Sequence, residues 1–230
     1  MPKTIVVVGF GPGISTAVAE KFGAEGFAVA LVARNQTRLA AGVEALQSRG
    51  ITATSVVADA SDPASIGAAL AKAKSELGPV TVLHWNAYGG AEGGDLMATN
   101  PAVVRGVFDV AIVGLLAAVQ VALPDLKSTP DGAVLVTNGA FGFLAPEVDA
   151  MATGMKTMGV ALANAAKAKL VGLLAQALKA DGVYVGEVTV AGAVKGTQFA
   201  GEGAGIDGAT IADKFWELYQ ARAELRATVS

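Results

Sequence analysis

The sequence predicts an α/β protein with a single doubly wound, Rossmann-type parallel sheet and helices on both faces. Strand-like runs of branched residues alternate with Ala/Leu helical patterns along nearly the whole chain, which favours βαβ units with right-handed crossovers. A Gly-rich turn follows the first strand-like run. The composition agrees, because 53% hydrophobic and 16% charged residues suit a sheet that is buried on both faces.

Six strands and the helices between them are expected in order along the chain. The predicted strands are Thr4–Val8, Ala28–Ala33, Thr52–Ala58, Val80–Trp85, Ala133–Thr137 and Val183–Val190. The predicted helices run from the glycine turn to about Gly26, then over Thr37–Arg49, Pro63–Leu77, Pro101 to about Leu126, Ala150–Ala180 and Thr210–Leu225. Proline at the start of the third helix and Gly78-Pro79 after it are typical helix boundaries.

The 230 residues show no break in composition, so we expect one domain over residues 1–230. Its segment 191–225 contains a Gly/Ala-rich loop and then a helix that carries Phe215, Trp216 and Tyr219. This arrangement suits a substrate loop with a lid helix over a pocket. The alternative is a surface loop followed by a helix that packs on the core.

Composition also excludes several classes of function. A net charge of −3 without a Lys/Arg block makes nucleic acid an unexpected partner. The chain has no cysteine and one histidine, His84, so no metal site is expected. The longest uncharged helical run, Val110 to Pro124, is shorter than the roughly 18 residues of a membrane span. With no signal peptide visible, we expect a cytoplasmic protein that does not enter membranes.

The Gly-rich turn is the first candidate site. Gly9, Gly11 and Gly13 lie where the first strand passes into the first helix, and Ile14 opens that helix. Glycines let the backbone turn sharply and approach a phosphate, while the helix N-terminus offers free N–H groups and a positive dipole. In this strand–turn–helix context, the pattern predicts dinucleotide binding.

These residues resemble the short-chain dehydrogenase/reductase family, and the resemblance extends over nearly the whole chain. The family turn is Gly-x-x-x-Gly-x-Gly, which Gly9 and Gly13 match, whereas Ser15 replaces the third glycine. The other positions that match are Asp59 near the adenine, Asn86-Ala87 of the family's Asn-Asn-Ala-Gly with Tyr88 replacing its glycine, and Gly192 and Thr197 of the segment that faces the nicotinamide. The resemblance implies a nicotinamide dinucleotide as cofactor.

The end of the second strand indicates which dinucleotide. Members that prefer NAD carry an Asp or Glu there for the ribose 2′-hydroxyl. This chain reads Ala33-Arg34-Asn35, without a carboxylate. A guanidinium binds a 2′-phosphate through paired, charge-assisted hydrogen bonds, so NADP(H) is expected in preference to NAD(H).

The family's catalytic residues are mostly missing. The resemblance implies a Ser near the end of the fifth strand, a Tyr-x-x-x-Lys on the following helix, and an Asn on the preceding long helix. Lys156 fits the lysine, which also holds the nicotinamide ribose. The tyrosine position is then Ala152, the serine position Gly139 and the asparagine position Ala111, so only the lysine is retained.

Two functional hypotheses remain open. The first is an NADP(H)-dependent oxidoreductase that acts on a small apolar carbonyl, alcohol or activated double bond by an atypical proton route. Tyr88 is the alternative proton donor, although it could simply pack on its loop, and His84 is expected to be a hydrogen-bonded core residue. The second is a catalytically silent nucleotide-binding protein with a regulatory or structural role.

A homo-oligomer is the expected assembly. Both long helices carry few charges and are apolar on more than one face, so they need burial on two sides. The sheet can cover one side, and a second subunit can cover the other in a homodimer or homotetramer. Flanking helices of the same chain are the alternative cover.

Overall fold

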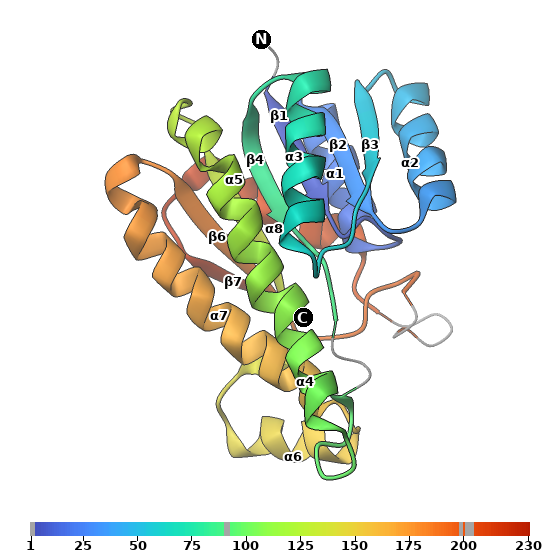
Figure 1. Cartoon of the computed structure of the whole chain (residues 1–230), viewed down its shortest axis with the longest axis vertical. Helices are drawn as coiled ribbons and strands as arrows, with labels where there is room; N and C mark the ends of the chain where they lie inside the picture. The colour runs from blue at the N-terminus through green and yellow to red at the C-terminus, as the bar shows by residue number, and fades with distance from the viewer. Residues whose placement is uncertain (1–2, 90–92, 198–199, 201–204) are drawn as a thin grey trace.

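The computed structural model describes residues 3–89, 93–197, 200 and 205–230. Its sheet has seven parallel strands in the order β3-β2-β1-β4-β5-β6-β7 (Figure 1). The strands are β1 (Thr4–Val8), β2 (Ala28–Ala33), β3 (Ala53–Val57), β4 (Val80–Trp85), β5 (Ala133–Gly139), β6 (Tyr184–Val190) and β7 (Arg226–Val229). The predicted doubly wound Rossmann-type fold is therefore confirmed.

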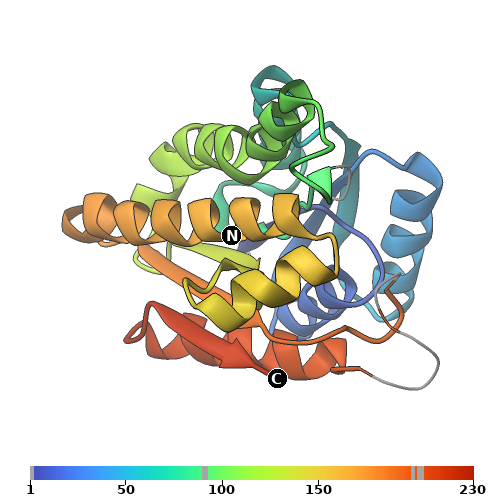
Figure 2. The same cartoon turned by 90° about the horizontal axis from the view of Figure 1, so that it is seen from below.

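The helices lie in two layers, one on each face of the sheet (Figures 1 and 2). The first layer consists of α1 (Ile14–Ala24), α2 (Gln36–Ser48) and α8 (Gly208–Ala221). The second contains α3 (Pro63–Leu77), α5 (Leu115–Lys127), which continues from α4 (Pro101–Phe108), and α7 (Met158–Leu178). Each layer contributes its own buried apolar cluster, with Phe22 and Phe215 in the first and Trp85 and Leu115 in the second.

The strand order places the crossover point between β1 and β4. The chain moves outward from β1 to β2 and β3, then returns to β4 on the other side of β1. Strands β1 and β4 are buried along their whole length, as expected for the centre of a parallel sheet. Ligands of such sheets bind at the carboxyl ends of the strands on either side of this point.

The long helix expected over Pro101 to Leu126 is interrupted. A π-helical turn, η2 (Asp109–Gly114), joins α4 to α5. A side chain at Gly114 would overlap the Ala60 carbonyl oxygen, at 1.9 Å from the ideal Cβ position. Glycine thus lets this turn approach the loop after β3. A π-helical turn within an α-helix is often found at a functional site.

The single helix expected over Ala150–Ala180 is also wrong. The structure has α6 (Pro146–Gly154) and α7, separated by a turn in which Lys156 has a φ of 52°. Proline at the first turn of α6 and the left-handed residue after its end set the limits of this separate helix.

The C-terminal segment adds a seventh strand and a packed helix. The β7 strand, only four residues long, pairs with β6 at the edge of the sheet. The α8 helix lies against α1, with Trp216 and Tyr219 against Phe22 and Phe27, and with Phe215 buried against His84. A role of segment 191–225 as substrate loop and lid helix stays a prediction.

Two helical stretches, Pro101–Lys127 and Met158–Asp181, are long and apolar enough to cross a membrane by length and composition. The stretch Pro101–Lys127 is longer than the uncharged run Val110 to Pro124, on which the sequence-based expectation was founded. Length and composition are weak evidence for a span, because the core helix of a soluble protein passes the same test. The inner sides of α5 and α7 pack on one face of the sheet, but only 39% and 33% of the two apolar stretches are buried, so part of their apolar surface is exposed.

His84 is a core residue, as the sequence predicts. It is fully buried on β4, with Nε2 3.1 Å from the Thr137 hydroxyl oxygen and its ring against Phe215. Nδ1 has no hydrogen-bond partner in the described part of the chain. Burial lowers the pKa of His84 to about 3, so the imidazole is neutral.

This burial predicts a loss of stability in mild acid. Because the pKa of His84 is lower in the folded state than in the unfolded state, its contribution is complete above the ordinary histidine pKa of 6.5 and is lost as the pH falls toward 3. Between pH 7 and pH 5 the free energy of unfolding should fall by about 2 kcal/mol. His84→Gln, which does not titrate, should remove this difference in urea titrations. An equal loss in the variant would contradict the assignment.

Candidate functional site: a nucleotide cavity at the carboxyl ends of the strands

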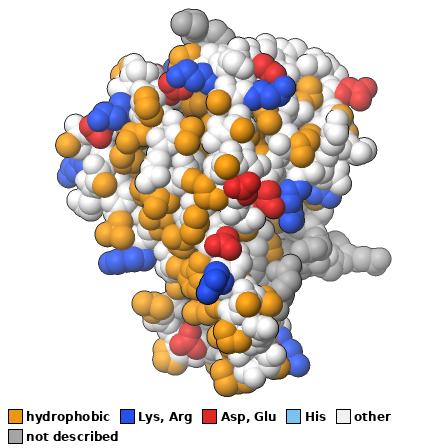
Figure 3. Space-filling model, viewed as in Figure 1, with side chains coloured by type: hydrophobic (Ala, Val, Ile, Leu, Met, Phe, Trp, Pro, Cys, Tyr) orange, Lys and Arg blue, Asp and Glu red, His pale blue; other side chains and the backbone are white. Residues whose placement is uncertain are grey.

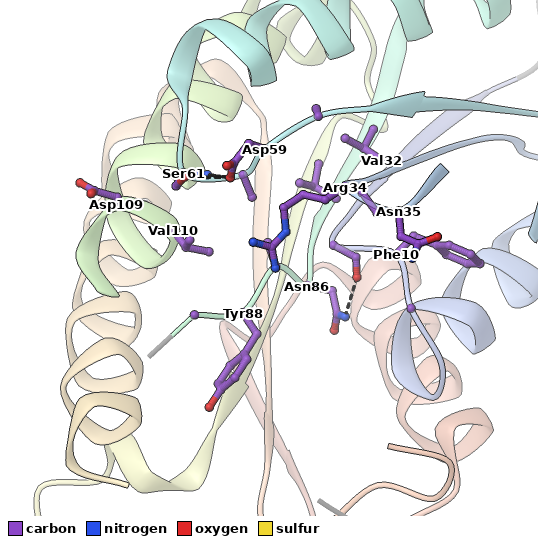
Figure 4. Close-up of a pocket in the computed structure, with 18 of the residues that line it drawn as sticks. Phe10, Val32, Arg34, Asn35, Asp59, Ser61, Asn86, Tyr88, Asp109 and Val110 are labelled. Atoms are coloured by element: carbon purple, nitrogen blue, oxygen red, sulfur yellow. Dashed lines mark hydrogen bonds between the residues drawn. The ribbon is translucent and has the colours of Figure 1, made fainter. Parts of the chain in front are cut away.

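A cavity of about 950 Å³ opens at the carboxyl ends of β1, β2, β3 and β4 (Figure 4). Its wall combines the turn after β1 with the loops after the other three strands and one face of α4 and η2. The lining residues used below are Gly9, Phe10, Gly11, Pro12, Arg34, Asn35, Arg38, Asp59, Ser61, Asn86, Ala87, Tyr88, Val103, Val107, Val110 and Thr197. It is thus located at the crossover point of the sheet.

Gly9 fixes the floor of the cavity. Its φ is +88°, and a Cβ there would lie 2.4 Å from the Ala87 backbone nitrogen. Its carbonyl oxygen accepts a hydrogen bond from the Asn86 side-chain amide at 3.2 Å, and the Asn86 N–H donates to Val8. Any larger residue would push the turn after β1 away from the loop after β4.

The N-terminus of α1 has no side-chain cap. In contrast, Asn35, Asp62, Asn100 and Asp207 accept hydrogen bonds at the starts of α2, α3, α4 and α8. Ser15, at the third glycine position, instead bonds the turn itself, since its hydroxyl accepts from Gly11 N–H at 2.8 Å and donates to Gly11 C=O at 2.9 Å. The free N–H groups and dipole of α1 suit a phosphate.

Arg34 extends from the end of β2 into the cavity (Figure 4). Arg38, one turn into α2, also lines the wall. The Asn35 carboxamide oxygen accepts the Arg38 backbone N–H at 2.8 Å, so Asn35 caps α2 while it lines the cavity. Of the described residues that line the cavity, the carboxylates Asp59 and Asp109 lie on the loop after β3 and on η2, so the side formed by the end of β2 and the start of α2 presents two guanidinium groups.

Asp59 is held as a carboxylate opposite Arg34. The Ser61 backbone N–H and hydroxyl donate to Asp59 Oδ1 at 2.9 Å and 2.8 Å. These bonds, with a smaller effect of the Arg34 charge, lower the pKa of Asp59. The loop after β3 thus presents a fixed acceptor, which suits a purine amine.

Other predicted residues lie at the border of the cavity. Gly13 and Ile14 open α1, but a Cβ at Gly13 would meet Thr197 at 2.9 Å and Val194 at 3.3 Å. The loop after β6 therefore lies against the Gly-rich turn after β1. Thr197 lines the cavity, and its hydroxyl donates to the Val194 carbonyl at 2.7 Å.

The chain matches the family model of the short chain dehydrogenases over residues 3–202. It belongs to the short chain dehydrogenase family. An oxidoreductase, UcpA of Escherichia coli, is 29% identical over 142 residues, which cover 61% of this chain and 52% of UcpA. A short chain dehydrogenase of Pseudocercospora fijiensis is 33% identical over 81 residues, 35% of this chain and 26% of the relative. The matches thus span about a quarter to a half of these relatives.

Solved structures show the same fold over nearly the whole chain. A metagenomic short-chain oxidoreductase in complex with NADP has a TM-score of 0.82 and 23% identity, covering 99% of this chain and 96% of that one. A short-chain dehydrogenase/reductase of Serratia marcescens has a TM-score of 0.84, 21% identity and the same coverage. At these identities, the similarity is evidence for the fold.

The structure does not bring Lys156 to the cavity. Lys156 is exposed in the turn between α6 and α7, and it is not among the lining residues of the described chain. Ala152 lies on α6, facing a separate apolar pocket beside Phe141 and Met158. Ala152 and Lys156 do not lie on one helix face beside β5, so the geometry gives no support to the family's Tyr-x-x-x-Lys at these two positions.

Lys167 has the position expected of the family lysine. It lies on α7, the helix packed beside β5, and is 5% exposed. Four residues earlier, at the position of the tyrosine, Ala163 packs against Ala111 and Val107. The sequence also contains Ala163-Asn-Ala-Ala-Lys167, but the choice of Lys156 overlooked the residues that form the separate helix α6.

Lys167 lies in a buried polar cluster rather than in the cavity. Glu187 on β6, 1% exposed, accepts from Asn138 at 3.0 Å and from Thr189 at 3.2 Å, and pairs with Arg226 at 3.2 Å. Burial lowers the pKa of Lys167 to about 8, and the Glu187 charge partly opposes this shift. The ammonium is thus mostly charged at neutral pH in an unfavourable environment.

Removing this ammonium should stabilise the protein. The lowered pKa costs about 3 kcal/mol at pH 7, a cost that declines as the pH rises from 8 toward the ordinary lysine value of 10.5. Lys167→Met should therefore unfold at higher urea concentration than the wild type at pH 7, and the difference should shrink at pH 9.5. Lys169→Met, an exposed neighbour on α7, is the matched control and should show neither effect. A destabilised Lys167→Met variant at pH 7 would contradict a net cost of burying the ammonium.

Proposed function

We propose that this protein is an NADP(H)-dependent oxidoreductase that acts on a small apolar carbonyl, alcohol or activated double bond. The main support is Arg34, whose guanidinium enters the cavity from the end of β2, where no carboxylate would repel a 2′-phosphate. The NADP in the structurally similar metagenomic oxidoreductase supports the same cofactor class.

The described residues fit this cofactor. The uncapped start of α1 would receive the diphosphate, Arg34 and Arg38 the 2′-phosphate, and Asp59 the adenine. The full set proposed to hold it is Gly9, Gly11, Gly13, Ile14, Arg34, Asn35, Asp59, Asn86, Ala87 and Thr197, with Arg38 added by the structure. Lys156, which the family spacing assigns to this set, is left out because it is exposed away from the cavity.

The bound nicotinamide would supply the hydride, and the chain would orient the substrate and provide the proton. Val103, Val107 and Val110 give the cavity an apolar side, which motivates the substrate class. Tyr88, on the loop after β4, also lines the cavity (Figure 4), and we propose its phenol as the proton donor in place of the family tyrosine. Water would replenish its proton.

A catalytically silent nucleotide-binding protein is the second candidate. It is favoured by the apolar cluster of Val107, Ala111 and Ala163, which occupies the positions of the family's acid–base groups. In this case the nucleotide would stabilise or regulate an assembly.

We also propose a cytoplasmic homodimer or homotetramer formed through the long helices. Apolar side chains gather along α5 and α7 on the outer face of the molecule (Figure 3). Val121 on α5 and Leu173 on α7 are 45% and 56% exposed, and Val113 on the preceding turn η2 is 42% exposed. A second copy would bury this surface. Sedimentation as a monomer at micromolar concentration would contradict this proposal.

The cofactor preference can be tested at Arg34. Arg34→Gln removes a charge-assisted contact with the 2′-phosphate, so the Kd for NADPH should rise about 10- to 100-fold while that for NADH stays unchanged. Arg49→Gln, an exposed arginine paired with Glu20 outside the cavity, should change neither value. Isothermal titration measures both constants. Tighter binding of NADH than of NADPH by the wild type would overturn the NADP(H) assignment.

Turnover separates the two candidates. With NADPH and a panel of small aldehydes, ketones and enones, the wild type should oxidise the cofactor, measured by absorbance at 340 nm. Tyr88→Phe should lower kcat by about 100-fold without changing the Kd for NADPH. Turnover that is unaffected would exclude Tyr88 as the donor. Tight NADPH binding without turnover would favour the silent protein.

A further inference from the structure

The four catalytic positions of the family are separated from the cavity in this structure. Within the described chain, Ala111, Gly139, Ala163 and Lys167 are all absent from its lining. The wall ends instead at Val107 and Val110. The nicotinamide half of the site, meaning the part that serves the nicotinamide and its ribose, thus reaches the cavity through Thr197, but its catalytic positions are not part of the cavity wall.

An apolar contact closes this region from the side of α4. Val107, Ala111 and Ala163 pack together and are 2%, 3% and 4% exposed. Val107 also lines the cavity, so it forms the boundary between the cavity and the tyrosine position. Side chains of this size pack tightly here only because the large phenol and the polar amide are both missing.

Asn164 closes the same region from the end of β5. Its side-chain nitrogen lies 2.5 Å from where a Cβ at Gly139 would be, so the amide fills the space of a side chain at the serine position. Asn164 is 5% exposed, and its backbone carbonyl accepts from Asn138 at 3.0 Å. The Asn164 amide therefore occupies the space in which the side chain of the family serine would lie.

Lys167 is directed into the protein. It is 5% exposed, and the Glu187 charge acts on it without an ion pair, because Glu187 contacts Asn138, Thr189 and Arg226 instead. An ammonium that held the nicotinamide ribose would have to turn out of this buried position. The loop after β6 also lies close to the turn after β1, because a side chain at Gly13 would meet Thr197 and Val194.

The adenosine half of the site presents charged side chains and free backbone N–H groups, which are missing at the catalytic positions of the nicotinamide half. Arg34 and Arg38 present two cations, Asp59 is a fixed carboxylate, and the uncapped α1 faces the turn. We infer that the adenosine with its 2′- and 5′-phosphates provides nearly all of the affinity, and the remaining, nicotinamide-bearing half almost none. The ligand class is then the 2′-phosphorylated adenosine nucleotides, with or without a nicotinamide. This inference rests on the proposed NADP(H) site.

Competition between whole and half ligands tests the inference on the intact chain. Isothermal titration with NADPH and with adenosine 2′,5′-bisphosphate should give Kd values within fivefold of each other. Adenosine 5′-diphosphate, which lacks the 2′-phosphate, should bind at least tenfold more weakly than the bisphosphate. NADPH that binds more than fivefold tighter than the bisphosphate would overturn the inference and leave the proposed function intact. Binding of neither ligand would refute the proposed nucleotide site itself.

A variant provides a second, independent readout. If Lys167 held the ribose, Lys167→Met would weaken NADPH and leave the bisphosphate unaffected, so the ratio of the two Kd values would change. We expect an unchanged ratio, as in the control Lys169→Met. Circular dichroism verifies that both variants are folded. A fivefold or larger loss of NADPH affinity alone would contradict the inference.

Discussion

The close approach of two backbones, at Gly9 and at Asn86–Ala87, is the contact on which the candidate site depends. With a separation that excludes even a Cβ, the turn after β1 and the loop after β4 form one floor. Beyond this contact the chain leaves β1 and β4 toward opposite faces of the sheet. The α1 helix that follows β1 lies on one face, and α4 and α5, which follow β4, lie on the other. The cavity exists where these elements separate, and the Asn86 amide, bonded to Gly9 C=O, holds the floor together.

At the family's catalytic positions, the side chains that replace the usual residues pack against one another rather than leaving empty space. Asn164 fills the space beside Gly139, and Ala163 packs on Ala111. These changes fit one another: a serine at 139 would collide with Asn164, and a tyrosine at 163 would displace Val107. Interior packing is dense enough that such neighbours must change together. Restoring one family residue at a time would therefore be opposed by its neighbours.

The sequence predicts well both the sheet and the residues that line the cavity after β1 and β2, because both depend on local signals. The glycine turn, the strand that precedes it and Arg34 at the end of β2 are short-range patterns. The errors involve spacing and context. Lys156 lies in the segment that the sequence predicts as one helix after the fifth strand, but Pro146 begins a separate helix, and Lys167 is the lysine on the helix beside β5. The four residues of β7 carry no periodic signal, and only pairing with β6 makes them a strand.

The buried charges under α7 also have a geometric consequence. Lys167 costs stability, since its pKa is lowered to about 8, whereas Glu187 has fixed partners on β5, β6 and β7. Arg226 also donates to the Ala168 carbonyl of α7, so the same guanidinium joins the helix to the carboxylate. Polar contacts of this kind have a single satisfactory arrangement, unlike apolar surfaces that can slide. They hold α7 at one rotation relative to β6, and that rotation directs Ala163 toward Ala111 and Asn164 toward Gly139. The buried cluster thus determines which side chains separate the cavity from the former catalytic positions.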